Sequence, residues 1–359
     1  MSKIISVPAF VDMHCHTREP GYEYKEDIES CLKAAYAGGY AAIVAMPNTN
    51  PVTDNTDTLT YVISRAKEVG LTKLLPTAAI TVGQKGGELT DFPALKAAGA
   101  VAFTDDGRPV ERSGMMADAM KSCAEYDCLI ISHCEELPLA TGAINAGETA
   151  KKLGVRGTPN AAEDVMTARD IILSEMTGCR LHIAHVSTKG SAELIRAAKK
   201  RGVRVTAETC PHYFTFIDED VERIGVNAKM NPPLRSKEDR DAIIEAIVDG
   251  TIDCISTDHA PHSAEEKARG LASAPNGIIG LQTAFASAYT YLVKAGHITL
   301  ERLSELMTYN PCKILGIAVP EEKVDIEIED GFVFDESMIL SKSHNSPYIG
   351  MTLYGRVIR

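Results

Sequence analysis

The chain has 359 residues, of which 45% are hydrophobic and 24% charged, so it is long enough for one large domain or two smaller ones. Its formal net charge of −12 argues against nucleic acid or an anionic membrane as the main partner. No apolar run approaches the roughly 20 residues that cross a bilayer, and the N-terminus becomes polar too soon for a signal peptide. Nine cysteines without a CxxC pair lie in apolar segments, which predicts a reduced, cytoplasmic chain.

Short apolar or β-branched segments alternate with helix-like segments along most of the chain. The predicted strands are residues 4–10, 40–46, 73–80, 99–104, 128–132, 180–186, 203–209 and 253–257. Predicted helices between them include residues 25–39, 54–70, 191–202 and 236–250. Ser236 opens the last of these with a capping-box spacing, and Thr158–Pro159 is a second predicted helix start.

This alternation predicts an α/β fold, a (β/α)₈ barrel over residues 1–310. An open doubly wound sheet is the alternative, but no glycine-rich nucleotide-binding loop follows the first predicted strand. From residue 311 the pattern changes to short strands, within 324–337 and 351–359. We interpret residues 311–359 as a small C-terminal β segment.

Polar residues recur where the predicted strands end, which is where barrels of this type place their chemistry. The main ones are His14, His16 and Arg18 after the first strand, Asn48 after the second, Asp105 and Asp106 after the fourth, His133 after the fifth, His185 after the sixth, and Asp258 and His262 after the eighth. His14 and His16 are two apart, so both face one side of a strand. Four histidines and two carboxylates suit one or two divalent ions, most often Zn²⁺.

Other polar residues have plainer interpretations. His182 precedes His185 by three positions and so faces the opposite way, into the core or behind the site. His212 and His259 are interpreted as supports for metal ligands, and His297 and His344 as solvent-facing. Asp105 is interpreted as a turn residue, and Glu135 and Glu136 as charges at a helix start. Arg18 is either a surface ion-pair partner or a residue of the same pocket as His16.

The segments DMHCHTREPG, MPNT, FTDDGRPV, HCEE, HVST, ETCPHY, NPPLR and TDHAPH, in this order, resemble bacterial dihydroorotases that lack a carboxylated lysine, within the amidohydrolase superfamily. The resemblance spans nearly the whole chain. It implies one metal on His14, His16 and Asp258, a second on His133 and His185, and Asp106 as the bridge. It also implies that the substrate contacts His16, Arg18, Asn48, Asn231, His262 and the backbone around Asn276 and Gly277.

The reaction implied by the resemblance is the reversible interconversion of N-carbamoyl-L-aspartate and L-dihydroorotate, an early step of pyrimidine synthesis. A metal-bound hydroxide would attack the ring amide carbonyl, with Asp258 as general base and then general acid. Arg18 would separate this activity from hydrolysis of neutral rings, because a guanidinium forks onto a planar carboxylate.

Members of this family usually have a longer N-terminal segment that helps to build a β-sandwich beside the barrel. Here the HxH motif begins at residue 14, so the C-terminal strands need another cover for their edges. A second copy of the chain or aspartate transcarbamoylase is the expected partner. Position 276 is Asn where the resemblance leads us to expect an aromatic residue, which implies a looser substrate cover. Residues 262–278 are polar and small enough for a lid.

Two alternatives to dihydroorotase activity stay open. One is a related cyclic amidase acting on hydantoins, dihydropyrimidines or allantoin, although such enzymes usually bridge their metals with a carboxylated lysine. The other is a non-catalytic partner of aspartate transcarbamoylase, although proteins of that kind tend to lose metal ligands and this sequence keeps all six.

Overall fold

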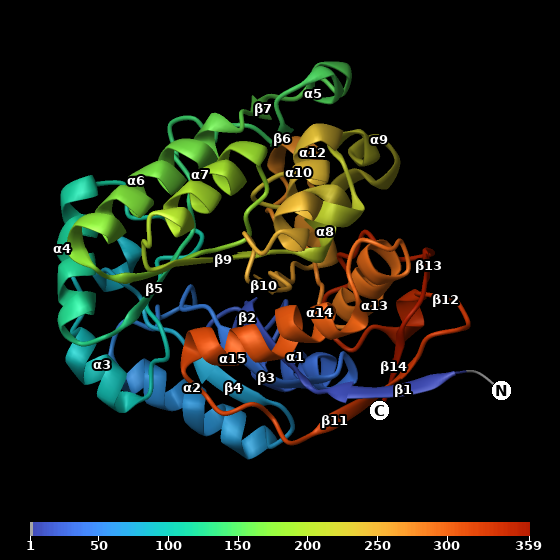
Figure 1. Cartoon of the computed structure of the whole chain (residues 1–359), viewed down its shortest axis with the longest axis horizontal. Coiled ribbons are helices and arrows are strands. Elements are labelled where there is room, and N and C mark those ends of the chain that lie inside the picture. The colour runs from blue at the N-terminus through green and yellow to red at the C-terminus, as the bar shows by residue number, and fades with distance from the viewer. Residues whose placement is uncertain (1–2) are drawn as a thin grey trace.

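Two parallel β-sheets lie at the centre of the computed structural model, which describes residues 3–359 (Figure 1). One contains, in spatial order, β2 (Phe10–Cys15), β3 (Tyr40–Ala45) and β4 (Lys73–Pro76). The other contains β5 (Leu129–Ser132), β8 (Arg180–Ile183), β9 (Val205–Thr209) and β10 (Cys254–Ile255). The predicted α/β class with parallel strands is therefore confirmed.

Single-residue bridges link the two sheets at both of their ends. Phe103 pairs in parallel with Ala78, just beyond β4, and with Ile130 in β5. Residues 99–104 were predicted to form a strand, but they pair only through these single-residue bridges and not through a ladder of several residues. At the opposite ends, Cys15 of β2 pairs in parallel with His259, which lies just beyond β10.

Helices follow the strand positions in turn and pack around the sheets (Figure 1). The longer ones are α1 (Ile28–Ala37), α2 (Thr56–Val69), α3 (Phe92–Ala98), α4 (Ser113–Glu125), α6 (Ala161–Thr177), α7 (Lys189–Lys200) and α10 (Lys237–Val248). Shorter ones are α5 (Glu148–Lys152), α8 (Pro211–Thr215), α9 (Val221–Ile224), α11 (Ala264–Lys267), α12 (Gly270–Ser273), α13 (Ala284–Ala288), α14 (Leu300–Ser304) and α15 (Asn310–Leu315).

Two predicted helix starts have different outcomes. Ser236 caps α10 as predicted, because its hydroxyl accepts a hydrogen bond from the Asp239 backbone N–H. The start at Thr158–Pro159 is wrong by a few residues: Thr158 ends the short strand β7 (Gly157–Thr158), which pairs with β6 (Ile144–Asn145), and α6 begins at Ala161.

The first predicted strand, residues 4–10, is divided between two sheets. Residues Ile4–Pro8 form β1, which pairs antiparallel with β11 (Lys323–Glu327), and β11 pairs with β14 (Arg356–Ile358). The first strand of the parallel sheets is β2 instead. Nearby, β12 (Phe332–Val333) and β13 (Thr352–Leu353) form a two-stranded ladder, so the short C-terminal strands were predicted correctly. Figure 1 shows β1 beside β11, with both chain ends in this region.

Side chains of the parallel strands point alternately into two apolar clusters. Val11, Met13 and Val44 belong to one that lies between the sheets and that Cys312 and Ile314 of α15 also join. Phe10 and Ile43 point the other way, into a larger cluster shared with the helices. All nine cysteines are buried and unpaired, as their places in apolar segments lead one to expect. Among residues 3–359, no helix is both long and apolar enough to span a bilayer.

Candidate active site

Strand β2 is buried along its whole length and carries His14, and the buried His16 follows directly after its last residue. The buried carboxylate of Asp12 makes this possible: it accepts hydrogen bonds from the Thr257 backbone N–H at 2.9 Å and from the Thr257 hydroxyl at 2.6 Å. These bonds tie β2 to the chain just after β10. His14, His16 and Asp258 are thereby brought to one place.

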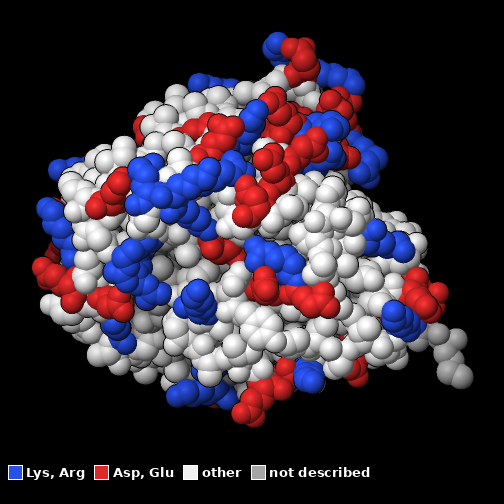
Figure 2. All heavy atoms as spheres, viewed as in Figure 1, with Lys and Arg blue, Asp and Glu red and all other residues white. Residues whose placement is uncertain are grey.

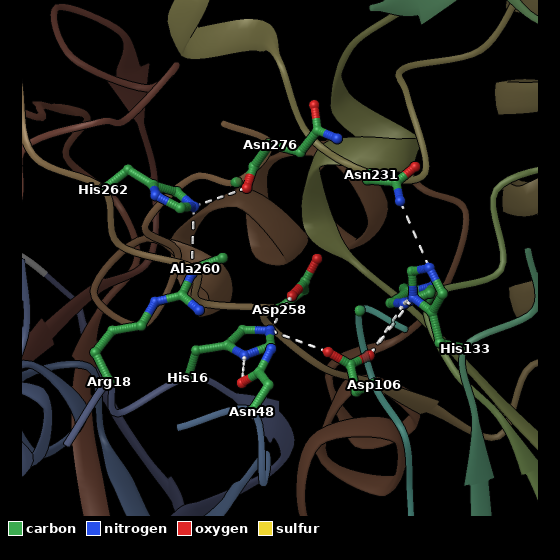
Figure 3. Close-up of a pocket in the computed structure, with 13 residues that line it drawn as sticks. His16, Arg18, Asn48, Asp106, His133, Asn231, Asp258, Ala260, His262 and Asn276 are labelled. Carbon is green, nitrogen blue, oxygen red and sulfur yellow. Dashed lines mark hydrogen bonds and ion pairs between the residues drawn. The ribbon is translucent and has the colours of Figure 1, made fainter. Parts of the chain in front are cut away.

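The carboxylate of Asp106 lies at the centre of the predicted metal ligands (Figure 3). Its Oδ1 is 3.3 Å from His14 Nε2, 3.5 Å from His133 Nδ1 and 3.7 Å from His185 Nε2. Its Oδ2 is 3.5 Å from His16 Nε2. The two oxygens of one carboxylate thus face histidines from both proposed metal positions, as a bridging ligand must.

Asp258 lies beside two of the same histidines. Its Oδ1 is 3.2 Å from His16 Nε2 and 3.6 Å from His14 Nε2. Two sets of donors are compact enough to share a cation: His14 with His16 and Asp258, and His14 with Asp106 and His185. The structure therefore brings together all six residues predicted as ligands.

Two of these buried donor atoms make no hydrogen bond to any residue that the structure describes, namely His14 Nε2 and Asp106 Oδ1. Buried polar atoms rarely lack a partner in native proteins. Imidazole nitrogens and carboxylate oxygens are the ligands that Zn²⁺ and similar ions take. The residues present therefore fit a metal ion.

The pKa values of the site residues also fit a bound metal ion. Burial favours a raised pKa for Asp106, yet the neighbouring His14 and His133 hold that pKa well below its usual range. Burial also favours a lowered pKa for His133, but Asp106 and Glu135 raise the pKa to about 10. Without a cation, protons on His14 and His133, whose pKa values are raised, would balance the buried carboxylates, and a bound cation would replace them.

Three residues of the site have left-handed backbone conformations that are uncommon outside glycine. The φ angles are +60° at Arg18, +36° at His185 and +44° at Asp258. Such angles cost free energy and persist only where surrounding contacts enforce them. Each one turns a side chain sharply at a strand end, toward the cavity.

A cavity of about 230 Å³ opens beside the predicted metal ligands. Its walls include every residue predicted to contact the substrate, namely His16, Arg18, Asn48, Asn231, His262, Asn276 and Gly277. Figure 3 shows Arg18 and His262 on one side of this space and His133 with Asn231 on the other. Gly277 suits its position, because its φ is +139° and a Cβ there would lie 2.7 Å from the Ala260 carbonyl oxygen.

Hydrogen bonds hold the polar walls of the cavity in place. Asn48 Oδ1 lies 2.9 Å from His16 Nδ1, which leaves His16 Nε2 toward the carboxylates. The Arg18 Nε–H donates to the Pro261 carbonyl oxygen at 3.2 Å, which fixes the guanidinium at the rim. Arg18 is buried and is not a surface ion-pair partner.

Comparison with known proteins agrees with this arrangement. Residues 2–191 match the family model described as Dihydro-orotase-like. A dihydroorotase from Acetivibrio thermocellus is 50% identical over 98% of this chain and 84% of its own length. One from Bacillus caldolyticus is 48% identical over 97% of this chain and 83% of its own. The chain belongs to the dihydroorotase family.

Solved structures place this dihydroorotase-family chain among cyclic amide hydrolases. An L-hydantoinase (dihydropyrimidinase) from Arthrobacter aurescens superposes with a TM-score of 0.88 at 25% identity, over 99% of this chain and 83% of the other. A dihydropyrimidinase from Brevibacillus agri superposes with a TM-score of 0.80 at 20% identity, over 99% and 83%, which shows likeness of fold alone.

Glu208 is a residue of this site that the sequence reasoning missed. It lies at the end of β9, is fully buried, and places Oε1 2.9 Å from His14 Nδ1. Its other oxygen accepts from the Ser256 hydroxyl and lies 3.2 Å from His182 Nε2. A carboxylate on the far nitrogen of a ligating histidine fixes its tautomer and its orientation. The signal in the sequence was the spacing of Thr206 and Glu208, which places both side chains on one face of the predicted strand 203–209.

Glu135 is not a helix-start charge, which corrects the prediction. It lies in the loop after β5, with its carboxylate 3.1 Å from His133 Nε2, and it accepts from the Asn231 side-chain amide at 2.9 Å. Asp105 holds a turn as predicted, accepting from the backbone N–H groups of Ile80 and Thr81.

The remaining histidines lie outside the two metal donor sets of His14. His182 is buried and hydrogen-bonded to Thr206 and Glu208. Together with Glu208 and Cys254 it forms a third compact group of possible metal donors, but in this group His182 and Glu208 already bond to each other. His259 contacts the Gly280 N–H, and His212 packs against the Tyr213 ring. His297 and His344 are exposed, as predicted.

We expect Glu208→Gln to weaken zinc binding by about tenfold to a hundredfold, because Gln keeps the shape but loses the charge that orients His14. Competition with a chelating dye measures this affinity directly. Glu26→Gln is the matched control, since Glu26 is equally buried but contacts His259, 3.4 Å away. Equal zinc affinity in the two variants would show that Glu208 does not support the ligand.

Proposed function

We propose that this chain catalyses the reversible conversion of N-carbamoyl-L-aspartate to L-dihydroorotate in de novo pyrimidine biosynthesis. The observation that carries the proposal is the position of the Arg18 guanidinium, which lines the same cavity as Asp106, Asp258 and three of the four histidines predicted as metal ligands. Relatives named dihydroorotase, 46–50% identical to nearly the whole chain, support it.

The proposed cofactor is Zn²⁺, as one or two ions. His14, His16 and Asp258 would hold the first, His133 and His185 the second, and Asp106 would bridge them. When bound, such an ion lowers the pKa of water and polarises an amide carbonyl. Glu208 would keep His14 Nε2 pointed at the metal.

Asp258 is the proposed proton carrier of the reaction. Its burial favours a raised pKa, but the hydrogen bond with His16 and the nearby His14 lower the pKa to about 2, so the carboxylate is ionised at neutral pH. In the hydrolytic direction it would accept a proton from the attacking water and deliver it to the ring nitrogen that leaves.

Arg18 is the proposed determinant of substrate class. A buried guanidinium with free N–H groups needs an anionic partner. The carboxylate of dihydroorotate is planar and can accept two parallel hydrogen bonds from it. His16, Asn48 and His262 would contact nearby oxygens, while Asn231 and the backbone at Asn276 and Gly277 would hold the ring.

We also propose that the two parallel sheets form a closed (β/α)₈ barrel, with residues 1–310 as its catalytic domain. The bridges at Phe103 and Cys15, and the apolar cluster between the sheets, support closure. The division at residue 310, the interpretation of 311–359 as a remnant of a β-sandwich and the cytoplasmic location stay predictions. So do a homo-oligomer and a complex with aspartate transcarbamoylase.

A cyclic amidase for neutral rings is the second candidate, favoured by the structural likeness to hydantoinases. The test is a comparison of L-dihydroorotate, dihydrouracil and hydantoin as substrates of the zinc-loaded protein. We expect dihydroorotate to be hydrolysed with by far the highest kcat/KM. Turnover of the neutral rings without dihydroorotate would favour the cyclic amidase, and turnover of none would favour the non-catalytic partner.

A further inference from the structure

The segment 262–278, whose composition suggested a lid, is held in place by a buried lysine. Lys267 is the last residue of α11 and is only 4% exposed. Its ammonium group donates to three backbone carbonyl oxygens: Lys229 at 3.2 Å, Pro275 at 3.2 Å and Gly277 at 3.0 Å. An ammonium group has three N–H donors, so this set uses all of them.

Asn345 holds the same loop from the C-terminal β segment. Its side-chain amide N–H groups donate to the carbonyl oxygens of Ala260 at 3.1 Å and Gly277 at 3.0 Å, and its Oδ1 accepts from the His262 N–H. The Gly277 carbonyl therefore accepts from both Lys267 and Asn345. These side chains act together with two backbone hydrogen bonds, from the Gly277 N–H to the Lys229 carbonyl and from the Ala260 N–H to the Ile278 carbonyl, to fix this cavity wall.

The position of this loop determines how His262 is protonated. The carbonyl oxygen of Asn276 lies 2.8 Å from His262 Nε2 (Figure 3). A carbonyl only accepts, so Nε2 carries the hydrogen and donates it. In the neutral ring His262 Nδ1 is then the acceptor atom, and it lies 3.4 Å from the Lys25 ammonium and 3.3 Å from the Glu266 carboxylate, which are close to each other.

This tautomer leaves Arg18 free for a ligand. One terminal nitrogen of Arg18, Nη2, is 3.3 Å from His262 Nε2. Because that Nε2 carries a hydrogen, it cannot accept from Arg18, so the guanidinium N–H stays available toward the cavity. If the carbonyl of Asn276 moved away, the ring could change tautomer and accept this N–H.

We propose that Lys267 is a positioning residue for substrate binding: by fixing the 275–277 carbonyls, it sets the His262 tautomer and keeps Arg18 free for the substrate carboxylate. This inference rests on the proposed dihydroorotase function. Lys267 touches neither metal ligand nor cavity, so its loss acts on KM for a carboxylated substrate and leaves the zinc content unchanged.

The test compares Lys267→Met with Lys199→Met in the zinc-loaded full chain. Lys199 is the control, because its half-buried ammonium also donates to a backbone carbonyl, that of Gly250, and neither residue lines the cavity. We expect Lys267→Met to raise KM for L-dihydroorotate about tenfold or more, since displacements near 1 Å in a site have effects of that size. Zinc content and kcat should change little, and Lys199→Met should keep the wild-type KM.

Equal KM values in the two variants, with both folded by circular dichroism, would overturn the inference. If Lys267→Met does not fold, Asn345→Ala takes its place, because it removes the second donor to the Gly277 carbonyl, and an unchanged KM there would overturn the inference too. Wild-type protein that binds zinc but does not hydrolyse dihydroorotate would overturn the proposed function, and this inference with it.

Discussion

Asp106→Asn is expected to lower kcat/KM for L-dihydroorotate by roughly a thousandfold or more, beyond the tenfold to hundredfold effect of a residue that only supports a ligand. The reason is the central place of this carboxylate, whose two oxygens face four histidines at 3.3–3.7 Å. Asn is neutral and has one oxygen where a bridge needs two. Zinc per chain, measured by atomic emission, should fall together with activity.

Asp105→Asn is the control for this experiment, because Asp105 is the adjacent residue and is also buried. Its carboxylate accepts from Ile80 and Thr81 and contacts no predicted ligand, so the variant should lose thermal stability but keep its zinc. Full zinc content and activity in Asp106→Asn would show that the site does not use a carboxylate bridge.

Arg18→Ala is expected to reduce kcat/KM for dihydroorotate by roughly a hundredfold, mainly through KM, because charge-assisted hydrogen bonds to a carboxylate are lost. Any slow turnover of dihydrouracil, which has no carboxylate, should be unaffected. Arg18→Lys should recover only part of the loss, because an ammonium cannot make the paired contact of a guanidinium. Steady-state kinetics on both substrates measures these effects.

The zinc content of both Arg18 variants should equal that of the wild type, since Arg18 contacts Pro261 and His262 but no predicted metal ligand. An equal loss of activity on both substrates would contradict a role in selecting the carboxylate. It would indicate that Arg18 acts on the structure of the site as a whole.

The closeness of the predicted ligands could be foreseen because strand ends meet in this architecture. Once the alternation of strands and helices is read, His14, Asp106, His133, His185 and Asp258 fall at equivalent places and must be neighbours. The class of fold follows from the same alternation. Gly277 and Asn276 lie in no repeated pattern, so their place in the cavity wall was inferred only through family resemblance.

The first strand was misassigned because a local sequence pattern does not specify which other strand it pairs with. Residues 4–8 are extended, as predicted, but they pair with residues 323–327 at the other end of the chain. The true central strand, FVDMHC, contains an acid and a histidine and so looks poorly suited to a core. Its Asp12 is tolerated there because Thr257 supplies two hydrogen bonds, which no local pattern reveals.

Supporting residues were the hardest to predict. Glu208 contacts His14, which lies 194 positions away in the sequence. Lys267 donates to the backbone carbonyls of Lys229 and Gly277, which lie in two different loops. An isolated Glu or Lys in a sequence is usually a solvated surface residue. Only its burial in the folded chain shows otherwise.

Hydrolysis of L-dihydroorotate by the purified chain alone, before and after removal of its metal, tests the central claim most directly. The protein stripped with a chelator should be inactive, and Zn²⁺ should restore turnover as one or two ions bind per chain. Absence of turnover with zinc fully bound would contradict the account.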